Sequence, residues 1–159
     1  MRILFAFATV LMLTACGQAS APAASPETDA AESAAFEAVV TDAFVMVPLE
    51  GRDVTMGGAV IEVTGQKAKL VAAEAAFAEA IELHTVSMDD GQMRMRQVDG
   101  YDLTPGTPLA LQRGSDHLMV FGVTQLESGS QYPVRLTFQL EDGTTSEAEI
   151  LATAKSLGE

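Results

Sequence analysis

The sequence predicts an all-β domain, and specifically an antiparallel β-sandwich of Greek-key type with about seven to nine strands. Several segments alternate apolar and polar residues with a period of two, which is typical of strands that bury one face. Turn-forming residues such as Asp142-Gly143 separate these segments at short intervals. An Asp-Gly pair between alternating segments is a strong short-range signal for a β-hairpin.

Residues 132–151, "YPVRLTFQLEDGTTSEAEIL", give the clearest of these hairpins. The apolar residues of its first half fall on one face of a strand: Val134, Leu136, Phe138 and Leu140. Arg135, Thr137 and Gln139 fall on the other face, because successive strand side chains point in opposite directions. We therefore expect a strand before the Asp142-Gly143 turn and a return strand that runs to about Ile150.

Three upstream segments show the same pattern of strand, turn and strand. Residues 59–74 turn at Gly65, residues 81–98 turn at Asp89-Asp90-Gly91, and residues 107–123 turn around Arg113-Gly114-Ser115. Within this region residues 69–83, "KLVAAEAAFAEAIEL", have a high helix propensity. Propensity is a weak prior that packing overrides, and the neighbouring segments favour an extended or looped path here.

The N-terminal segment, "MRILFAFATVLMLTAC", has one basic residue, a short apolar run and small residues at its end. These features predict a secretory signal peptide over residues 1–15, because the apolar run is too short to span a bilayer. Leu13-Thr14-Ala15-Cys16 resembles the bacterial lipobox, so we expect Cys16 to be lipidated. The alternative is an ordinary signal peptide that carries a cysteine by chance. Gly17 after the cysteine favours the outer membrane over the inner membrane.

Residues 16–35 are rich in Ala, Ser and Pro and have no apolar periodicity, which indicates a flexible tether. Residues 36–155 are long enough for one domain with a hydrophobic core. Cys16 is the only cysteine of the chain, so this domain has no disulfide and no thiolate metal site. The net charge of −13 makes nucleic acid an unsuitable partner.

Two histidines and two methionines form the candidate metal site of this domain. His117 and Met119 are two residues apart in a predicted strand, so they share a face. His84 and Met95 lie on opposite sides of the predicted turn at Asp89-Asp90-Gly91, which brings their strands together. One rim of the sandwich could therefore gather all four side chains.

The types of residue in this set favour Cu(I). Thioether sulfur is a soft neutral donor that selects cuprous copper, whereas Mg²⁺ and Ca²⁺ prefer oxygen. Zinc sites are built from cysteine, histidine and carboxylate, and a blue-copper centre needs a cysteine thiolate. The alternative is that the methionines fill gaps in the core and the histidines are structural.

Neighbouring residues are expected to have plainer roles. We expect Met88 to pack in the core or at the rim, with transient contact to copper as its alternative, and Met93 to pack beside Met95. Arg94 and Arg96 are expected on a solvated strand face, with docking of an acidic partner as the alternative. Asp116 should point away from His117, so it is not a predicted ligand.

At these residues the chain resembles the periplasmic copper chaperones called PCu(A)C. The spacing of His84, Met95, His117 and Met119 matches the family signature H-x10-M-x21-H-x-M. "RDVTMGGAVIEVTG", "IELHT", "GQMRMRQVDG" and "DHLMVFG" also resemble that family in the same order, from about residue 44 to 151. The chain departs from the family in having Thr85 and Val86 where many relatives have methionine, in the "AAFAEA" segment, and in a C-terminus without a His- and Met-rich tail.

The resemblance implies a cupredoxin-like β-sandwich that binds one Cu(I) through the four signature residues. It also implies delivery of copper to the binuclear CuA centre of cytochrome c oxidase in the periplasm. We expect the protein to be a monomer. The alternatives are an envelope copper buffer without a dedicated client and a scaffold whose His and Met residues only pack. An enzyme is least expected, because no Ser-His-Asp or Cys-His arrangement is available and two histidines cannot form a three-histidine zinc site.

Overall fold

The structure, a computed structural model, describes residues 35–158, and this part of the chain contains strands and no helix. It therefore also contains no helix that could span a membrane. The predicted signal peptide, Cys16 and nearly all of the predicted tether lie outside the described residues. The strands are β1 (Glu37–Met46), β2 (Thr55–Thr64), β3 (Ala68–Glu74), β4 (Ala80–Asp89), β5 (Gln92–Gln97), β6 (Tyr101–Leu103), β7 (Leu109–Leu111), β8 (His117–Phe121), β9 (Gln131–Leu140) and β10 (Thr145–Lys155).

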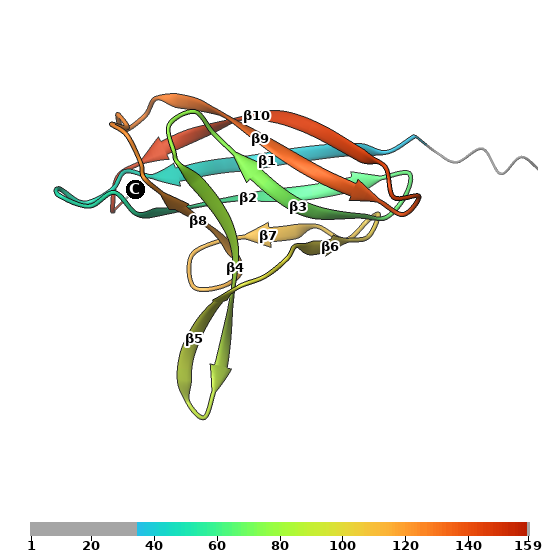
Figure 1. The fold of residues 1–159 in the computed structure, drawn as a ribbon, viewed down its shortest axis with the longest axis horizontal. Helices are drawn as coiled ribbons and strands as arrows, with labels where there is room; N and C mark the ends of the chain where they lie inside the picture. The colour runs from blue at the N-terminus through green and yellow to red at the C-terminus, as the bar shows by residue number, and fades with distance from the viewer. Residues whose placement is uncertain (1–34, 159) are drawn as a thin grey trace, which may run out of the picture. The chain divides into compact units, whose positions relative to one another are not determined.

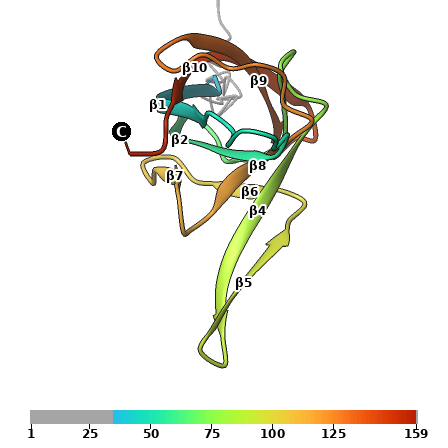
Figure 2. The same cartoon turned by 90° about the vertical axis from the view of Figure 1, so that its left-hand side faces the viewer.

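The prediction of an all-β fold is confirmed, and the strands form a flattened barrel (Figure 1). Their order is β5-β4-β8-β2-β1-β10-β9-β3-β6, and β7 pairs with β2. A single pair, Ala73 with Ile81, joins β3 to β4 and closes the ring. The β1–β10 pair is parallel and the other pairs are antiparallel. Figure 2 shows this ring of strands nearly end on.

The core fills the inside of this ring. As predicted, Val134, Leu136 and Phe138 of β9 point inward and are at most 5% exposed. Residues of the other layer meet them, including Ile61 of β2 and Leu118 of β8. Gly58 lets the strands pack closely where β7 meets β2, because a Cβ atom there would clash with the backbone oxygen of Leu111.

The chain adds two strands that the sequence pattern does not reveal, β1 and β6. The alternation of β1 is interrupted by a bulge between Thr41 and Phe44, where Asp42 has a φ of 52°. A bulge inserts a residue and so shifts the side chains that follow to the other face. β6 has three residues and is too short for a period to be recognised.

The helix-prone residues 69–83 form all but the first residue of β3, a short turn and the first part of β4, as the strand-rich context predicts. β3 is held between β9 on one side and β6 on the other. The ladder with β9 runs along β3 to Glu74 and supplies backbone hydrogen bonds, which outweigh the helix propensity of the alanines. Phe77 in the turn is buried and packs edge-on against Tyr132, with ring centroids 5.5 Å apart.

The β4–β5 hairpin projects from the barrel (Figure 1). β4 pairs with β8 only as far as His84, and beyond that residue it pairs with β5 alone. Asp90 and Gly91 both have positive φ, at 51° and 77°. This is the geometry of a two-residue type I′ turn, so the predicted turn is confirmed. Every residue of β5 is exposed.

Tyr101 of β6 fixes the place where the hairpin leaves the barrel. Its hydroxyl donates a hydrogen bond to the backbone oxygen of His84 at 2.6 Å and lies 3.5 Å from that of His117. Burial, together with the nearby negative charge of Asp116, raises the pKa of Tyr101 from 10.0 to about 12. The protonated hydroxyl therefore stabilises the folded state.

We predict that Tyr101→Phe lowers stability at neutral pH by about 1 kcal/mol, the usual contribution of one intramolecular hydrogen bond. Because the pKa is higher in the folded state, the tyrosine's contribution is complete below pH 10 and is lost as the pH rises toward 12. Urea unfolding at pH 8 and pH 11 should therefore show a smaller difference between wild type and Tyr101→Phe at the higher pH. Tyr132→Phe is the matched control. Because it keeps Tyr101, its free energy of unfolding should fall between pH 8 and pH 11 as that of the wild type does. An equal difference at both pH values would contradict the role of Tyr101.

Candidate metal centre

The two histidines of the domain lie directly opposite each other on neighbouring strands. His84 of β4 pairs with His117 of β8, and this is the last pair of the β4–β8 ladder. The ring centroids are 6.1 Å apart. His117 is 2% exposed and the side chain of His84 is 14% exposed. The imidazoles are therefore together, largely shielded, at the base of the projecting hairpin.

Hydrogen bonds leave one ring nitrogen of each histidine free to act as a ligand. His117 Nδ1 is 2.7 Å from the backbone oxygen of Ser115, which can only accept, so the neutral ring carries its lone pair on Nε2. His84 Nε2 is 2.8 Å from a carboxylate oxygen of Glu82, which places the lone pair of its neutral ring on Nδ1. That Nδ1 is buried and has no hydrogen-bond partner among the described residues. A bound metal ion would satisfy it.

The thioethers of Met119 and Met95 are on the same face of the sheet as the two imidazoles. Met119 lies opposite Glu82, two residues before His84 on β4. Met95 lies opposite Val86, two residues after His84. Because strand side chains alternate, these register positions put all four predicted ligands on one face. Met119 is half-buried and Met95 is 53% exposed, so the set runs from the barrel surface outward onto the hairpin.

The separation of the rings is compatible with one shared ion. Metal–nitrogen bonds are about 2.0 Å long, so two imidazoles on one ion have their centres about 5 to 6.5 Å apart. Within residues 35–158 no group of three or more His, Cys, Asp or Glu side chains could hold a metal. An ion held by His84 and His117 thus depends on methionine sulfur for its further ligands, which favours a soft ion.

Two residues that support the site were not identified from the sequence. Glu82 holds the ring of His84, and Tyr101 holds the backbone of both histidine strands. A carboxylate that accepts from the far nitrogen of a metal-binding histidine fixes its tautomer and makes it a better ligand. The position of Glu82, two residues before His84 in an alternating strand, was an available signal. No sequence pattern near Tyr101 indicates its role, because only the folded chain brings β6 next to the histidine strands.

The prediction that Met88 packs in the core or at the rim is wrong, and Met93, which was expected to pack beside Met95, is also largely exposed. Their exposed fractions are 67% and 66%, because the hairpin that carries them stands clear of the barrel. The expectation for Asp116 is confirmed, since it accepts a hydrogen bond from Thr85 Oγ1 at 2.6 Å on the face opposite His84. Arg94 and Arg96 lie on an exposed strand, and Arg94 is 3.5 Å from Asp89.

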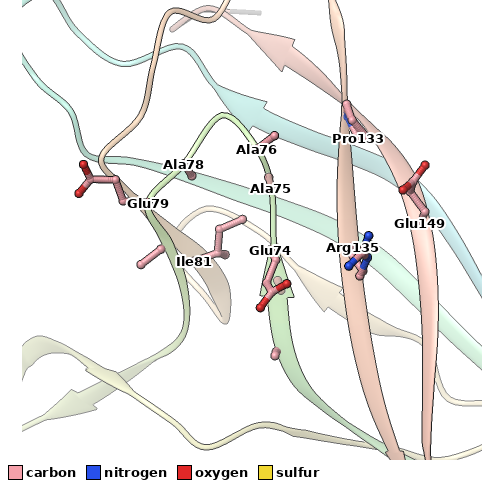
Figure 3. A pocket seen from close by; sticks show the side chains of 12 residues that line it. Glu74, Ala75, Ala76, Ala78, Glu79, Ile81, Pro133, Arg135 and Glu149 are labelled. Atoms are coloured by element: carbon pink, nitrogen blue, oxygen red, sulfur yellow. The ribbon is translucent and has the colours of Figure 1, made fainter.

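A large hollow elsewhere on the domain has no metal-binding character. It measures about 640 Å³ and lies beside the turn between β3 and β4 (Figure 3). Alanines line much of it, together with Glu74 of β3, Arg135 of β9 and Glu149 of β10. Arg135 lies opposite both glutamates in the register of the sheet, so its single positive charge offsets part of their negative charge. No histidine or methionine borders this hollow.

Comparison with solved structures identifies several similar domains. The copper-bound PCuAC domain from PmoF2 is 15% identical, with a TM-score of 0.60 over 75% of this chain and 92% of that one. The apo PCuAC domain from PmoF1 is 19% identical, with a TM-score of 0.58 over 75% and 93%. The Cu(I) form of DR1885 from Deinococcus radiodurans is 27% identical, with a TM-score of 0.56 over 82% and 85%. These likenesses confirm the cupredoxin-like β-sandwich and the resemblance to PCu(A)C domains.

Comparison of the sequence itself gives a family assignment. No curated protein sequence matches the chain. The model of one family, described as "Putative lipoprotein LpqE-like", matches residues 38–150, which include both histidines and all of the strands that carry them. That description is of a lipoprotein family, which agrees with an exported protein. On this match, the chain belongs to the LpqE-like family.

Proposed function

We propose that this protein is a copper carrier that binds one Cu(I) through His84, Met95, His117 and Met119 and passes it to another protein. The observation that carries this proposal is the buried, unpartnered Nδ1 of His84 directly across the ladder from His117. Thioethers lie on both sides of this pair of rings, on the same face. The solved PCuAC domains described as copper-bound support the same cargo.

The ligand set suits transport more than catalysis or electron transfer. All four ligands are neutral, so the empty site leaves no uncompensated anion and needs no protons when the ion departs. No thiolate is present to build a blue-copper centre. The exposed Met95 gives a partner access to the ion from the hairpin side. We therefore propose a binding protein and not an enzyme.

The partner and the location follow from the resemblance and from the first residues of the chain. We propose a CuA domain of cytochrome c oxidase as the acceptor, because PCu(A)C proteins are associated with supplying that centre. Residues 1–15 would be removed as a signal peptide, and lipidated Cys16 would anchor residues 36–155 in the periplasm, at the outer membrane. A tether over residues 16–35 has a coil span of only about 25 Å. The net charge of −13 argues against nucleic acid, and the carrier is proposed to act as a monomer.

We predict that Met119→Leu lowers the affinity for Cu(I) at least tenfold, because leucine keeps the volume and apolarity but removes the sulfur donor. Anaerobic titration against a competing Cu(I) chelator measures this loss. Met46→Leu is the matched control, since Met46 is half-buried on β1, which is separated from β8 by β2. Wild-type affinity in Met119→Leu, with an unchanged melting curve, would remove Met119 from the ligand set.

We predict that the copper-loaded domain transfers its ion to a reduced CuA domain and that the reverse transfer does not occur. Two thiolates bind Cu(I) more tightly than the neutral set, so the ion should move toward them. Separation of the two proteins after mixing, followed by copper analysis of each, measures the direction. Copper that stays with His84 and His117 would favour an envelope copper buffer.

We predict that Cys16→Ser releases the protein from the membrane fraction into the soluble periplasmic fraction. The substitution removes the thiol that would carry the lipid, and the described residues contain no membrane-spanning helix to replace it. Fractionation and immunoblotting of both forms make the measurement. A variant that remains with the membrane would exclude lipidation as the anchor.

A further inference from the structure

The methionines of the domain all lie on the face that carries the histidines. Met119 pairs with Met56 of β2 as well as with Glu82. Met46, Met56 and Met119 together line a hollow of about 280 Å³. On the other side of the histidines, Met88 pairs with Met93 and Met95 follows on the same strand face. The candidate ligands thus lie between two groups of thioethers, one half-buried and one on the hairpin.

The hairpin group is open to solvent. Met88, Met93 and Met95 are 67%, 66% and 53% exposed. Directly paired residues have Cβ atoms about 4.5–5.5 Å apart, and the next residue on the same face is about 6.6 Å further along the strand. Three flexible thioether side chains therefore reach a common point. That point lies toward the hairpin turn, near the Met88–Met93 pair, which is the next pair on this face after Val86 and Met95.

The composition of this face favours a metal-binding role over a purely apolar one. The opposite face of the same hairpin carries Ser87, Asp89, Arg94 and Arg96. On the outer part of the histidine face methionine occupies three of the four positions, Met88, Met93 and Met95, and Val86 occupies the fourth, although β-branched residues form strands better and leave equally good apolar surface. No carboxylate lies among the three sulfur atoms in the register. Neutral soft donors alone select Cu(I).

We propose that Met88, Met93 and Met95 form an outer Cu(I) site through which the ion enters and leaves the inner site. This inference rests on the proposed function. Met95 belongs to both sites, so one ion moves by ligand exchange. Bonds to Met88 and Met93 break as bonds to the free nitrogens of His84 and His117 form. Copper stays cuprous and no proton moves, because all of these ligands are neutral.

The outer site is tested first by NMR of protein labelled at the methionine methyl carbons, with Cu(I) added anaerobically. The first equivalent should shift the imidazole signals of His84 and His117 and the methyl signals of Met95 and Met119. A second equivalent should then shift or broaden the signals of Met88 and Met93. If the imidazole signals do not respond to the first equivalent, the proposed function itself fails. If they respond but Met88 and Met93 stay unperturbed at excess copper, the outer site alone is overturned.

The kinetic test compares two double variants, Met88→Leu/Met93→Leu and Met88→Gln/Met93→Gln. Both remove the sulfur atoms, but only the first keeps the apolar surface, and the exposure of the side chains means that neither should disturb folding. The probe is release of Cu(I) to bicinchoninate, which needs no protein partner. For both variants we expect unchanged affinity for the first ion and release slowed by about fivefold, which corresponds to about 1 kcal/mol in activation free energy.

The pair of variants separates a metal site from an apolar surface. Slow release in both variants, with unchanged affinity, supports the outer site. Wild-type release in the leucine variant overturns it, whatever the glutamine variant does. Slow release in the glutamine variant alone would show that apolar character, and not sulfur, is what matters on this face.

Discussion

The pairing of His84 with His117 at the end of the β4–β8 ladder is the constraint on which the rest of the site depends. Up to this pair, β4 is part of the barrel, and Leu83 and Leu118 on the other face of the same strands lie in the core. Beyond it, β4 continues only as one strand of the hairpin. The barrel thus positions both imidazoles, while the sulfur of Met95 comes from the hairpin that projects from it.

Because of this division, the solvent exposure of the candidate ligands increases from the barrel to the hairpin. His117 is 2% exposed and bonded through Nδ1 to Ser115, so its free nitrogen has one orientation. His84 is held by Glu82 at its ring and by Tyr101 at its backbone. Met95 has neither support. Such an arrangement suits the proposed carrier, because ligands fixed in advance reduce the cost of binding, and an exposed ligand at the open side is accessible to a partner.

The sequence predicts much of this arrangement because strand alternation is a local property. The spacing of His117 and Met119 places these two residues on one face, and the Asp90-Gly91 turn does the same for His84 and Met95. That the two pairs share a face depends on the pairing of β4 with β8, which no local pattern reveals. The support from Glu82 could have been read from the same alternation, but that from Tyr101 could not, since Tyr101 lies on β6, which pairs with β3 and not with either histidine strand. The exposure of Met88 and Met93 was also missed. Alternation predicts which side chains share a face, but it does not predict where the neighbouring strand ends and leaves that face exposed to solvent.

The position of the core explains why the fold should persist without copper. Phe138, Ile61 and Leu70 are fully buried inside the ring, on the side of the strands away from the histidines. The empty site leaves unsatisfied one buried nitrogen, that of His84, among the described side chains. An unpaired buried polar atom costs about 1–3 kcal/mol, which is a fraction of the stability of a domain of this size. Copper binding would recover that cost and add stability by linkage. In the proposed function the ion is therefore cargo for this barrel, unlike the zinc of small modules whose folding depends on the metal.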